Sequence, residues 1–259
     1  MKYRKLVAVL NLIAFIAMVT VNALASILPI NGLDTGEISN LYPNLFTPAG
    51  ITFSIWGVIY ILLLIYVIYQ IKVAWRASKI EPTIVDHISY WFMISSIANI
   101  GWILAWHYRN LVLSLIIMVI LLISLIVIYI RLDIGKYHPS KTERYMVDMP
   151  FSIYLGWISV ATIANVVVLL NDTGWSKWGL DDKWWTIIVI IVAVLLAIRY
   201  IANRRDVFYG LVIDWALFGI YLERSKDVII IDEVIYVLLG GIFIISVYMI
   251  YRIIRGDAY

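Results

Sequence analysis

Long apolar segments alternate with short polar connections along the whole chain. Eight such segments cover residues 6–28, 51–71, 88–106, 111–130, 149–170, 184–201, 207–222 and 234–254. Most of them approach the roughly 20 residues that a helix needs to cross about 30 Å of hydrocarbon, and 207–222 is the shortest. The pattern therefore predicts an all-α, polytopic integral membrane bundle of about eight transmembrane helices.

The composition agrees with this pattern. Hydrophobic residues make up 63% of the chain and charged residues 14%, which lies far outside the usual range for a soluble globular domain. The connections are short, and no glycine-serine linker separates parts of the chain. These features leave no room for a soluble domain between the spans.

Basic residues are unequally divided between the two sides of the predicted bundle. Of the 20 Lys and Arg residues, one side holds only Arg109, Lys177, Lys183, Arg224 and Lys226. Because Lys and Arg concentrate in short cytoplasmic loops, both termini are predicted to be cytoplasmic. The formal net charge of +3 then reflects topology and lipid head groups, and it does not indicate a nucleic-acid partner. A prokaryotic plasma membrane is the expected location, because no organellar presequence is recognisable.

The first segment allows a second interpretation. Basic residues before an apolar run, followed by Ala23-Leu24-Ala25, resemble a signal peptide with a small-residue cleavage site. The apolar run continues to Leu28, however, and is longer than the usual signal core of about 7–15 residues. We therefore expect an uncleaved span. Cleavage would leave seven spans and would not invert the others.

Several kinds of chemistry lack the residues that they need. Cysteine is absent, which excludes disulfides, thiolate metal sites and cysteine nucleophiles within this chain. The three histidines show no metal-ligand spacing, and no GxSxG, phosphate-loop or HExxH motif occurs. No metal site and no required cofactor are predicted. His107 is expected at the membrane interface, with a pocket mouth or an axial contact to a metalloporphyrin as open alternatives.

Aromatic and polar residues recur at helical spacing in three of the predicted spans. They are Pro48, Phe53, Trp56 and Tyr60 in the second, Asn99, Trp102 and Trp106 in the third, and Pro150, Tyr154, Trp157, Ala161 and Asn165 in the fifth. Spacings of i, i+3 and i+7 place such residues on one helix face, and these faces are expected to point at other helices. They predict either interhelical packing or the wall of a cavity. Asn11 and Asn22 share a face of the first span and are predicted to form interhelical hydrogen bonds.

These residues, in this order, resemble the TspO/MBR family of tryptophan-rich sensory proteins, translocator protein and the peripheral benzodiazepine receptor. The family motif P-x4-F-x2-W-x3-Y is met from Pro48 to Tyr60, and the Asn-x2-Trp element of its third helix is met by Asn99 and Trp102. The series of its fifth helix begins at Pro150. The three motifs fall in order within about residues 6–171, which makes the resemblance specific.

The resemblance implies a bundle of five helices around a pocket that the first loop, residues 29–47, would cap. Family members bind porphyrins, some bind sterols or benzodiazepine-type drugs, and light-dependent porphyrin breakdown has been attributed to bacterial members. The implied ligand-binding residues are Pro48, Phe53, Trp56, Tyr60, Asn99, Trp102, Trp106, Tyr154, Trp157, Ala161 and Asn165. Tryptophan faces can stack on a flat apolar disc such as a porphyrin, while asparagine can meet its polar edge.

The chain also departs from the family pattern. Thr47-Pro48-Ala49 stands where a double proline is usual, and residues 172–259 add about three helices to the usual five. We therefore expect a TspO/MBR-like membrane domain at 1–171 and a C-terminal membrane extension at 172–259. The extension could cover the surface through which five-helix members dimerise, so a homodimer stays an open alternative.

The extension contains the only ionisable residue deep in an apolar segment, Asp214. A carboxylate there is unfavourable unless it is paired, hydrated or protonated, and by default it indicates a functional site. The most specific functional hypothesis for Asp214 is that it couples proton movement to transport. The alternative is a carboxyl that only holds helices together.

Three functions remain open on the sequence alone. The first is a membrane receptor or sensor for a porphyrin or another planar apolar molecule, with slow photochemistry on that ligand as an open addition. The second is a secondary transporter of a small apolar or amphipathic solute, proton-coupled through Asp214, although no inverted repeat is recognisable. The third is a membrane scaffold or regulatory protein. We favour the first, and no enzymatic activity is assigned.

Overall fold

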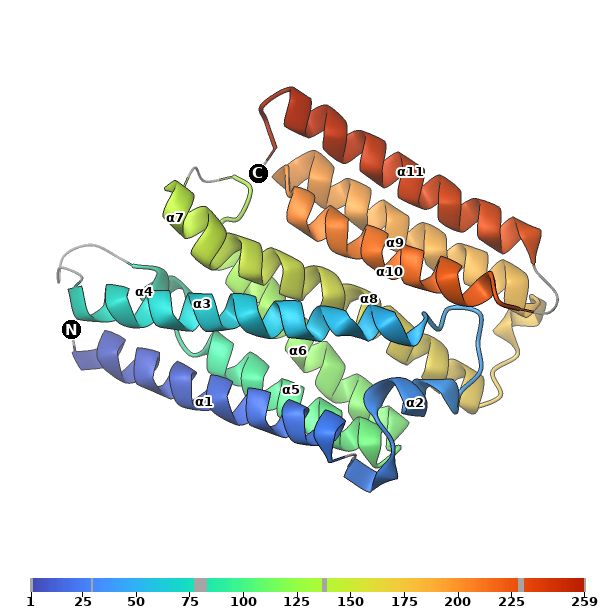
Figure 1. Cartoon of the computed structure of the whole chain (residues 1–259), viewed down its shortest axis with the longest axis horizontal. Coiled ribbons are helices and arrows are strands. Elements are labelled where there is room, and N and C mark those ends of the chain that lie inside the picture. The colour runs from blue at the N-terminus through green and yellow to red at the C-terminus, as the bar shows by residue number, and fades with distance from the viewer. Residues whose placement is uncertain (1, 29, 77–82, 137–138, 228–230, 259) are drawn as a thin grey trace. The chain divides into compact units, whose positions relative to one another are not determined.

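A computed structural model describes residues 2–28, 30–76, 83–136, 139–227 and 231–258. Helices account for all regular structure among these residues (Figure 1). The chain forms two compact units. The first unit comprises residues 1–35 and 56–155, and the second comprises 36–55 and 156–259. The predicted domains 1–171 and 172–259 stay a prediction.

In the part of the chain that the structure describes, eight long helices correspond to the eight apolar segments. They are α1 (Lys2–Ile27), α3 (Ile55–Arg76), α5 (Trp91–His107), α6 (Leu111–Arg131), α8 (Met149–Asp172), α9 (Asp182–Arg204), α10 (Val207–Arg224) and α11 (Asp232–Ile254). Among the described residues, six helical stretches, which contain α1, α3, α6, α8, α9 and α11, are long and apolar enough to cross a membrane. Helix α5 has 17 residues, and α10 has 18 and carries charged residues, Asp214, Glu223 and Arg224. The predicted all-α polytopic membrane bundle is confirmed.

Short elements connect the long helices. They are η1 (Ile30–Gly32), α2 (Thr35–Asn40), η2 (Gly50–Ser54), α4 (Ile84–Ile88), α7 (Lys141–Glu143), the π-helical turn η3 (Arg144–Asp148) and η4 (Lys177–Gly179). The predicted third segment therefore starts in a separate short helix. Ser89 has a positive φ of 51° and ends α4 before α5 begins, because a residue with positive φ cannot continue a right-handed helix.

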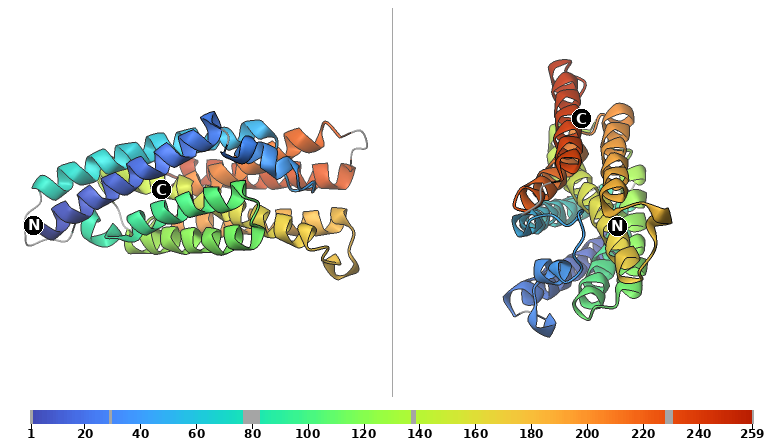
Figure 2. Two further views of the ribbon diagram at one scale, coloured as in Figure 1. Left: turned by 90° about the horizontal axis from the view of Figure 1, so that it is seen from below. Right: turned by 90° about the vertical axis from the view of Figure 1, so that its right-hand side faces the viewer.

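In the first unit, α1 packs along α5, and α5 packs along α6 (Figures 1 and 2). Buried amides join α1 to its neighbours. Asn11 Nδ2 donates to Gln70 Oε1 of α3 at 3.1 Å, and Asn22 Nδ2 donates to Asn99 Oδ1 of α5 at 2.6 Å. The interhelical role predicted for Asn11 and Asn22 is confirmed. In hydrocarbon such bonds hold helices together because lipid offers amides no hydrogen-bonding alternative.

An ion pair joins the start of α1 to α4. Arg4 Nε lies 2.9 Å from Asp86 Oδ2, and the backbone N–H of Thr83 donates to the same oxygen at 2.7 Å. Burial acts to raise the pKa of Asp86, but the hydrogen bonds from Arg4 and Thr83 outweigh it. The pKa of Asp86 therefore lies below its ordinary value.

In the second unit, α9, α10 and α11 pack against one another (Figures 1 and 2). Glycines permit the close approach. A Cβ atom on Gly210 would lie 2.8 Å from Ile201 Cδ1 and 2.9 Å from Met249 Sδ, and one on Gly241 would lie 2.7 Å from Val194 Cγ2. These distances are shorter than normal carbon contacts, so the three helices can pack this closely only with glycine at these positions.

Candidate functional site

Four aromatic rings of α3 and α5 form a column in the first unit. The rings of Trp56 and Tyr60 are 5.7 Å apart between centroids with an interplanar angle of 21°, and those of Trp102 and Trp106 are 6.1 Å apart at 21°. Both pairs have i, i+4 spacing, which brings side chains together on one helix. The rings of Trp56 and Trp102 connect the two pairs, with 6.0 Å between their centroids and an interplanar angle of 29°. We call these four residues the aromatic column.

A buried polar chain adjoins the aromatic column. Asn99, which accepts from Asn22, donates through Nδ2 to the hydroxyl of Tyr154 at 3.1 Å. The ring of Tyr154 in turn meets Trp56 edge-on, 6.2 Å between centroids at 70°. Asn99 and Tyr154 are completely buried. The structure thus brings together six predicted ligand residues, namely Trp56, Tyr60, Asn99, Trp102, Trp106 and Tyr154.

Two hydrogen-bond donors of the aromatic column have no acceptor among the described residues. They are the indole nitrogen of Trp102 and the hydroxyl of Tyr60, both inaccessible to solvent. The indole nitrogen of Trp106, by contrast, donates to the carbonyl of Thr35 at 3.2 Å. A buried polar group without a partner costs about 1–3 kcal/mol, so a ligand that offers acceptor oxygens would gain by meeting these donors.

His107, at the end of α5, is completely buried. Its Nδ1 lies 2.9 Å from the carbonyl oxygen of Ile30, and its Nε2 lies 3.2 Å from the hydroxyl of Thr35. A carbonyl only accepts, so Nδ1 carries the proton, and in the neutral ring Nε2 accepts from Thr35. Both nitrogens are engaged with the segment after α1, so His107 fastens that segment to α5. The sequence did not indicate this role, because the partners lie more than 70 positions away.

The other predicted ligand residues lie in the second unit. Phe53, in η2, meets Trp157 of α8 edge-on, 6.1 Å between centroids at 86°. Pro48 precedes η2, and Ala161 and Asn165 lie about one and two turns beyond Trp157 on α8. Asn165 is buried and Ala161 is half-buried. The structure therefore pairs Phe53 with Trp157 in this unit.

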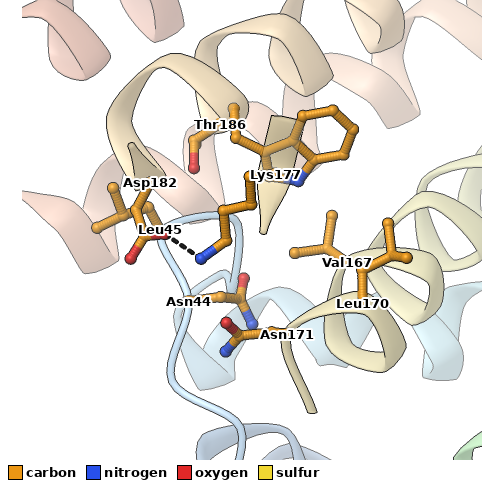
Figure 3. A pocket seen from close by; sticks show the side chains of 9 residues that line it. Asn44, Leu45, Val167, Leu170, Asn171, Lys177, Asp182 and Thr186 are labelled. Carbon is orange, nitrogen blue, oxygen red and sulfur yellow. Dashed lines mark hydrogen bonds and ion pairs between the residues drawn. The ribbon is translucent and has the colours of Figure 1, made fainter. Parts of the chain in front are cut away.

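A small pocket in the second unit, lined by both polar and apolar residues, was not indicated by the sequence (Figure 3). It is lined by Asn44, Leu45, Val167, Leu170, Asn171, Lys177, Asp182, Trp185 and Thr186. Lys177 and Asp182 form an ion pair at this pocket, and Asn171 Nδ2 donates to the carbonyl of Pro43 at 2.9 Å. Its cavity volume of about 20 Å³ suits about one water molecule. None of the predicted ligand residues lines it.

Asp214 lies half-buried in α10. The hydroxyl of Ser246, on α11, donates to Asp214 Oδ2 at 2.7 Å. The other carboxylate oxygen, Oδ1, is buried and has no partner among the described residues. This arrangement fits either a protonatable site or a carboxyl that joins two helices, and the proton-coupling role stays a prediction.

Comparison with known protein families matches most of the chain. A family model described as TSPO-like protein matches residues 8–251. The matched range continues well beyond residue 171, through α9 and α10 and into α11. No curated protein and no solved structure matches the chain.

Proposed function

The chain belongs to the TSPO-like protein family, and we propose that it is a membrane receptor or sensor that binds a planar apolar ligand, specifically a porphyrin. The observation that carries this proposal is the aromatic column together with its two unpartnered donors. A porphyrin combines a flat apolar ring with carboxylate side chains. Its ring can stack on indoles, and its carboxylates can accept from Trp102 and Tyr60.

The rings of the aromatic column already contact one another. Trp56 stacks with Tyr60 and with Trp102, so a flat ligand that stacks on Trp56 must separate at least one of these pairs. Binding would therefore rearrange the column and alter tryptophan emission. A rearrangement of side chains that depends on ligand is also what a sensor requires.

The test is a fluorescence titration of the detergent-purified protein with protoporphyrin IX in the dark. We expect saturable quenching at micromolar or lower concentration, and loss of that quenching in a variant with Trp102→Phe and Trp157→Phe. The control is Trp184→Phe, because Trp184 is half-exposed in the first turn of α9. Absence of saturable binding to the wild type would refute the porphyrin proposal. Illumination of the complex then asks whether porphyrin absorbance bleaches faster with the wild type than with the variant.

Transport is a second candidate, supported by the Asp214–Ser246 contact. A membrane-embedded carboxyl with one unpartnered oxygen can take up and release a proton during a transport cycle. Proton-dependent porphyrin uptake into proteoliposomes, abolished by Asp214→Asn and retained by Ser246→Ala, would favour this function. If neither binding nor uptake is found and proteins co-purify with the chain, a scaffold role becomes the better proposal.

A further inference from the structure

The segment that leads into α3 is fastened to the middle of α10. The backbone N–H of Ala49 donates to the carbonyl of Gly219 at 2.9 Å. The indole nitrogen of Trp215 donates to the carbonyl of Thr52 at 3.0 Å. Both bonds hold the backbone of residues 49–52, and their partners on α10, Trp215 and Gly219, lie one helical turn apart. Element η2 is thus tied to a helix more than 160 positions further along the chain.

Gly219 allows this contact because it has no side chain. A Cβ atom at Gly219 would lie 2.0 Å from Thr52 Oγ1, 2.6 Å from its Cγ2 and 2.8 Å from its Cβ. Thr52 is completely buried, so its side chain cannot move into solvent to make room. Any larger residue at position 219 must therefore push η2 away from α10.

Helix α10 also packs against α8 at Gly156, the residue at which α8 enters the second unit. A Cβ atom on Gly156 would lie 3.0 Å from Val212 Cβ and 3.3 Å from the carbonyl oxygen of Tyr209. Gly156 directly precedes Trp157. One helix thus contacts both the element that carries Phe53 and the element that carries Trp157, and these two rings meet edge-on.

We propose that α10 is the positioning element for Phe53 and Trp157, two predicted ligand residues of the second unit, and that Gly219 and Trp215 are positioning residues which hold Phe53 against Trp157. This inference rests on the proposed function, since Phe53 and Trp157 matter for a ligand only if the site binds one. It gives the C-terminal helices a role in binding. The bonds from Ala49 to Gly219 and from Trp215 to Thr52 are what tie the backbone of η2, and with it Phe53, to α10.

The experiment compares Gly219→Ala with Gly240→Ala. A Cβ atom on Gly240, which lies in α11, meets no atom within 4 Å, so this variant controls for adding a methyl group to a helix. A third variant combines Gly219→Ala with Thr52→Gly, which removes all three atoms that the new methyl would meet. Trp215→Phe, which loses the hydrogen bond to Thr52 and part of the indole but keeps an aromatic ring, serves as the milder change if Gly219→Ala does not fold.

Two readouts are taken on each protein. The first is the affinity for protoporphyrin IX, measured by titration in the dark. The second is amide hydrogen exchange of residues 49–53, which reports whether η2 stays on α10. We expect Gly219→Ala to weaken binding about tenfold or more and to speed exchange at 49–53. Trp215→Phe should do both to a smaller extent, the double variant should recover both, and Gly240→Ala should resemble the wild type.

The two readouts separate the failure of the inference from the failure of the proposed function. If Gly219→Ala exchanges faster at residues 49–53 but binds porphyrin with unchanged affinity, the positioning role is overturned. Unchanged exchange in Gly219→Ala would overturn it too. If the wild type binds no porphyrin, the proposed function fails. In that case, faster exchange in Gly219→Ala that Thr52→Gly reverses would still support α10 as the element that holds η2. Unchanged exchange in Gly219→Ala would refute that role as well.

Discussion

The two units join their helices by different means. In the first unit, buried amides bridge α1 to α3 and α1 to α5 through Asn11 with Gln70 and Asn22 with Asn99. In the second unit, glycines let α9, α10, α11 and η2 approach until backbone and side chain touch. Both means suit a membrane, where apolar side chains gain little by leaving lipid for protein. The amide bridges of the first unit depend on polar groups that are present, whereas the glycine contacts of the second unit, which also has the hydrogen bond from Ser246 to Asp214, depend on side chains that are absent.

The largest effect is expected from breaking a glycine contact in the second unit. Gly240 and Gly241 are adjacent on α11, but only Gly241 faces a close neighbour, Val194. Gly241→Ala should lower the free energy of unfolding by about 1–3 kcal/mol through overpacking. Gly240→Ala should leave it unchanged or raise it by up to about 1 kcal/mol, since alanine favours helix. Thermal unfolding of both variants in the same detergent measures the difference, and equal behaviour would contradict the glycine interpretation.

A smaller effect is expected from the amide bridges of the first unit. A double-mutant cycle with Asn22→Ala and Asn99→Ala should give a coupling energy of about 0.6–2 kcal/mol, typical of hydrogen bonds between membrane helices. The matched control pairs Asn22→Ala with Gln70→Ala, because Gln70 bonds to Asn11 and Tyr66 instead. Chemical unfolding of the purified proteins provides the energies. Additive effects of the Asn22 and Asn99 changes would show that this bond contributes nothing to stability.

The smallest effect is expected at the ion pair between α1 and α4. The pKa of Asp86 lies below its ordinary value in the folded protein, so its charge stabilises the fold above the unfolded pKa of about 3.9. That contribution should disappear as the pH falls through the lower folded value. For a partly exposed pair we expect about 0.2–1 kcal/mol at neutral pH. The free energies of unfolding of Asp86→Asn and of the wild type are compared at pH 7 and at pH 3. An equal difference between the two proteins at both pH values would contradict this prediction.

Much of the aromatic column was predictable from spacing within single helices. The i, i+4 pairs Trp56 with Tyr60 and Trp102 with Trp106 stack as helical periodicity requires. The connection between the pairs was not predictable in the same way, because the contact of Trp56 with Trp102 depends on how α3 and α5 pack. For His107 the sequence suggested an interfacial position, whereas tertiary packing buries both ring nitrogens against residues 30–35.

The membrane class, the eight helical segments, the family and the aromatic faces were predictable from the sequence, because each of these follows from local hydrophobicity, spacing or motif order. The contacts of η2 with α10 and of Phe53 with Trp157 are visible only in the folded chain. The physical reason is that these contacts join residues more than 100 positions apart. At Gly219 the contact depends on a missing side chain, which leaves no hydrophobic or periodic signal in the sequence.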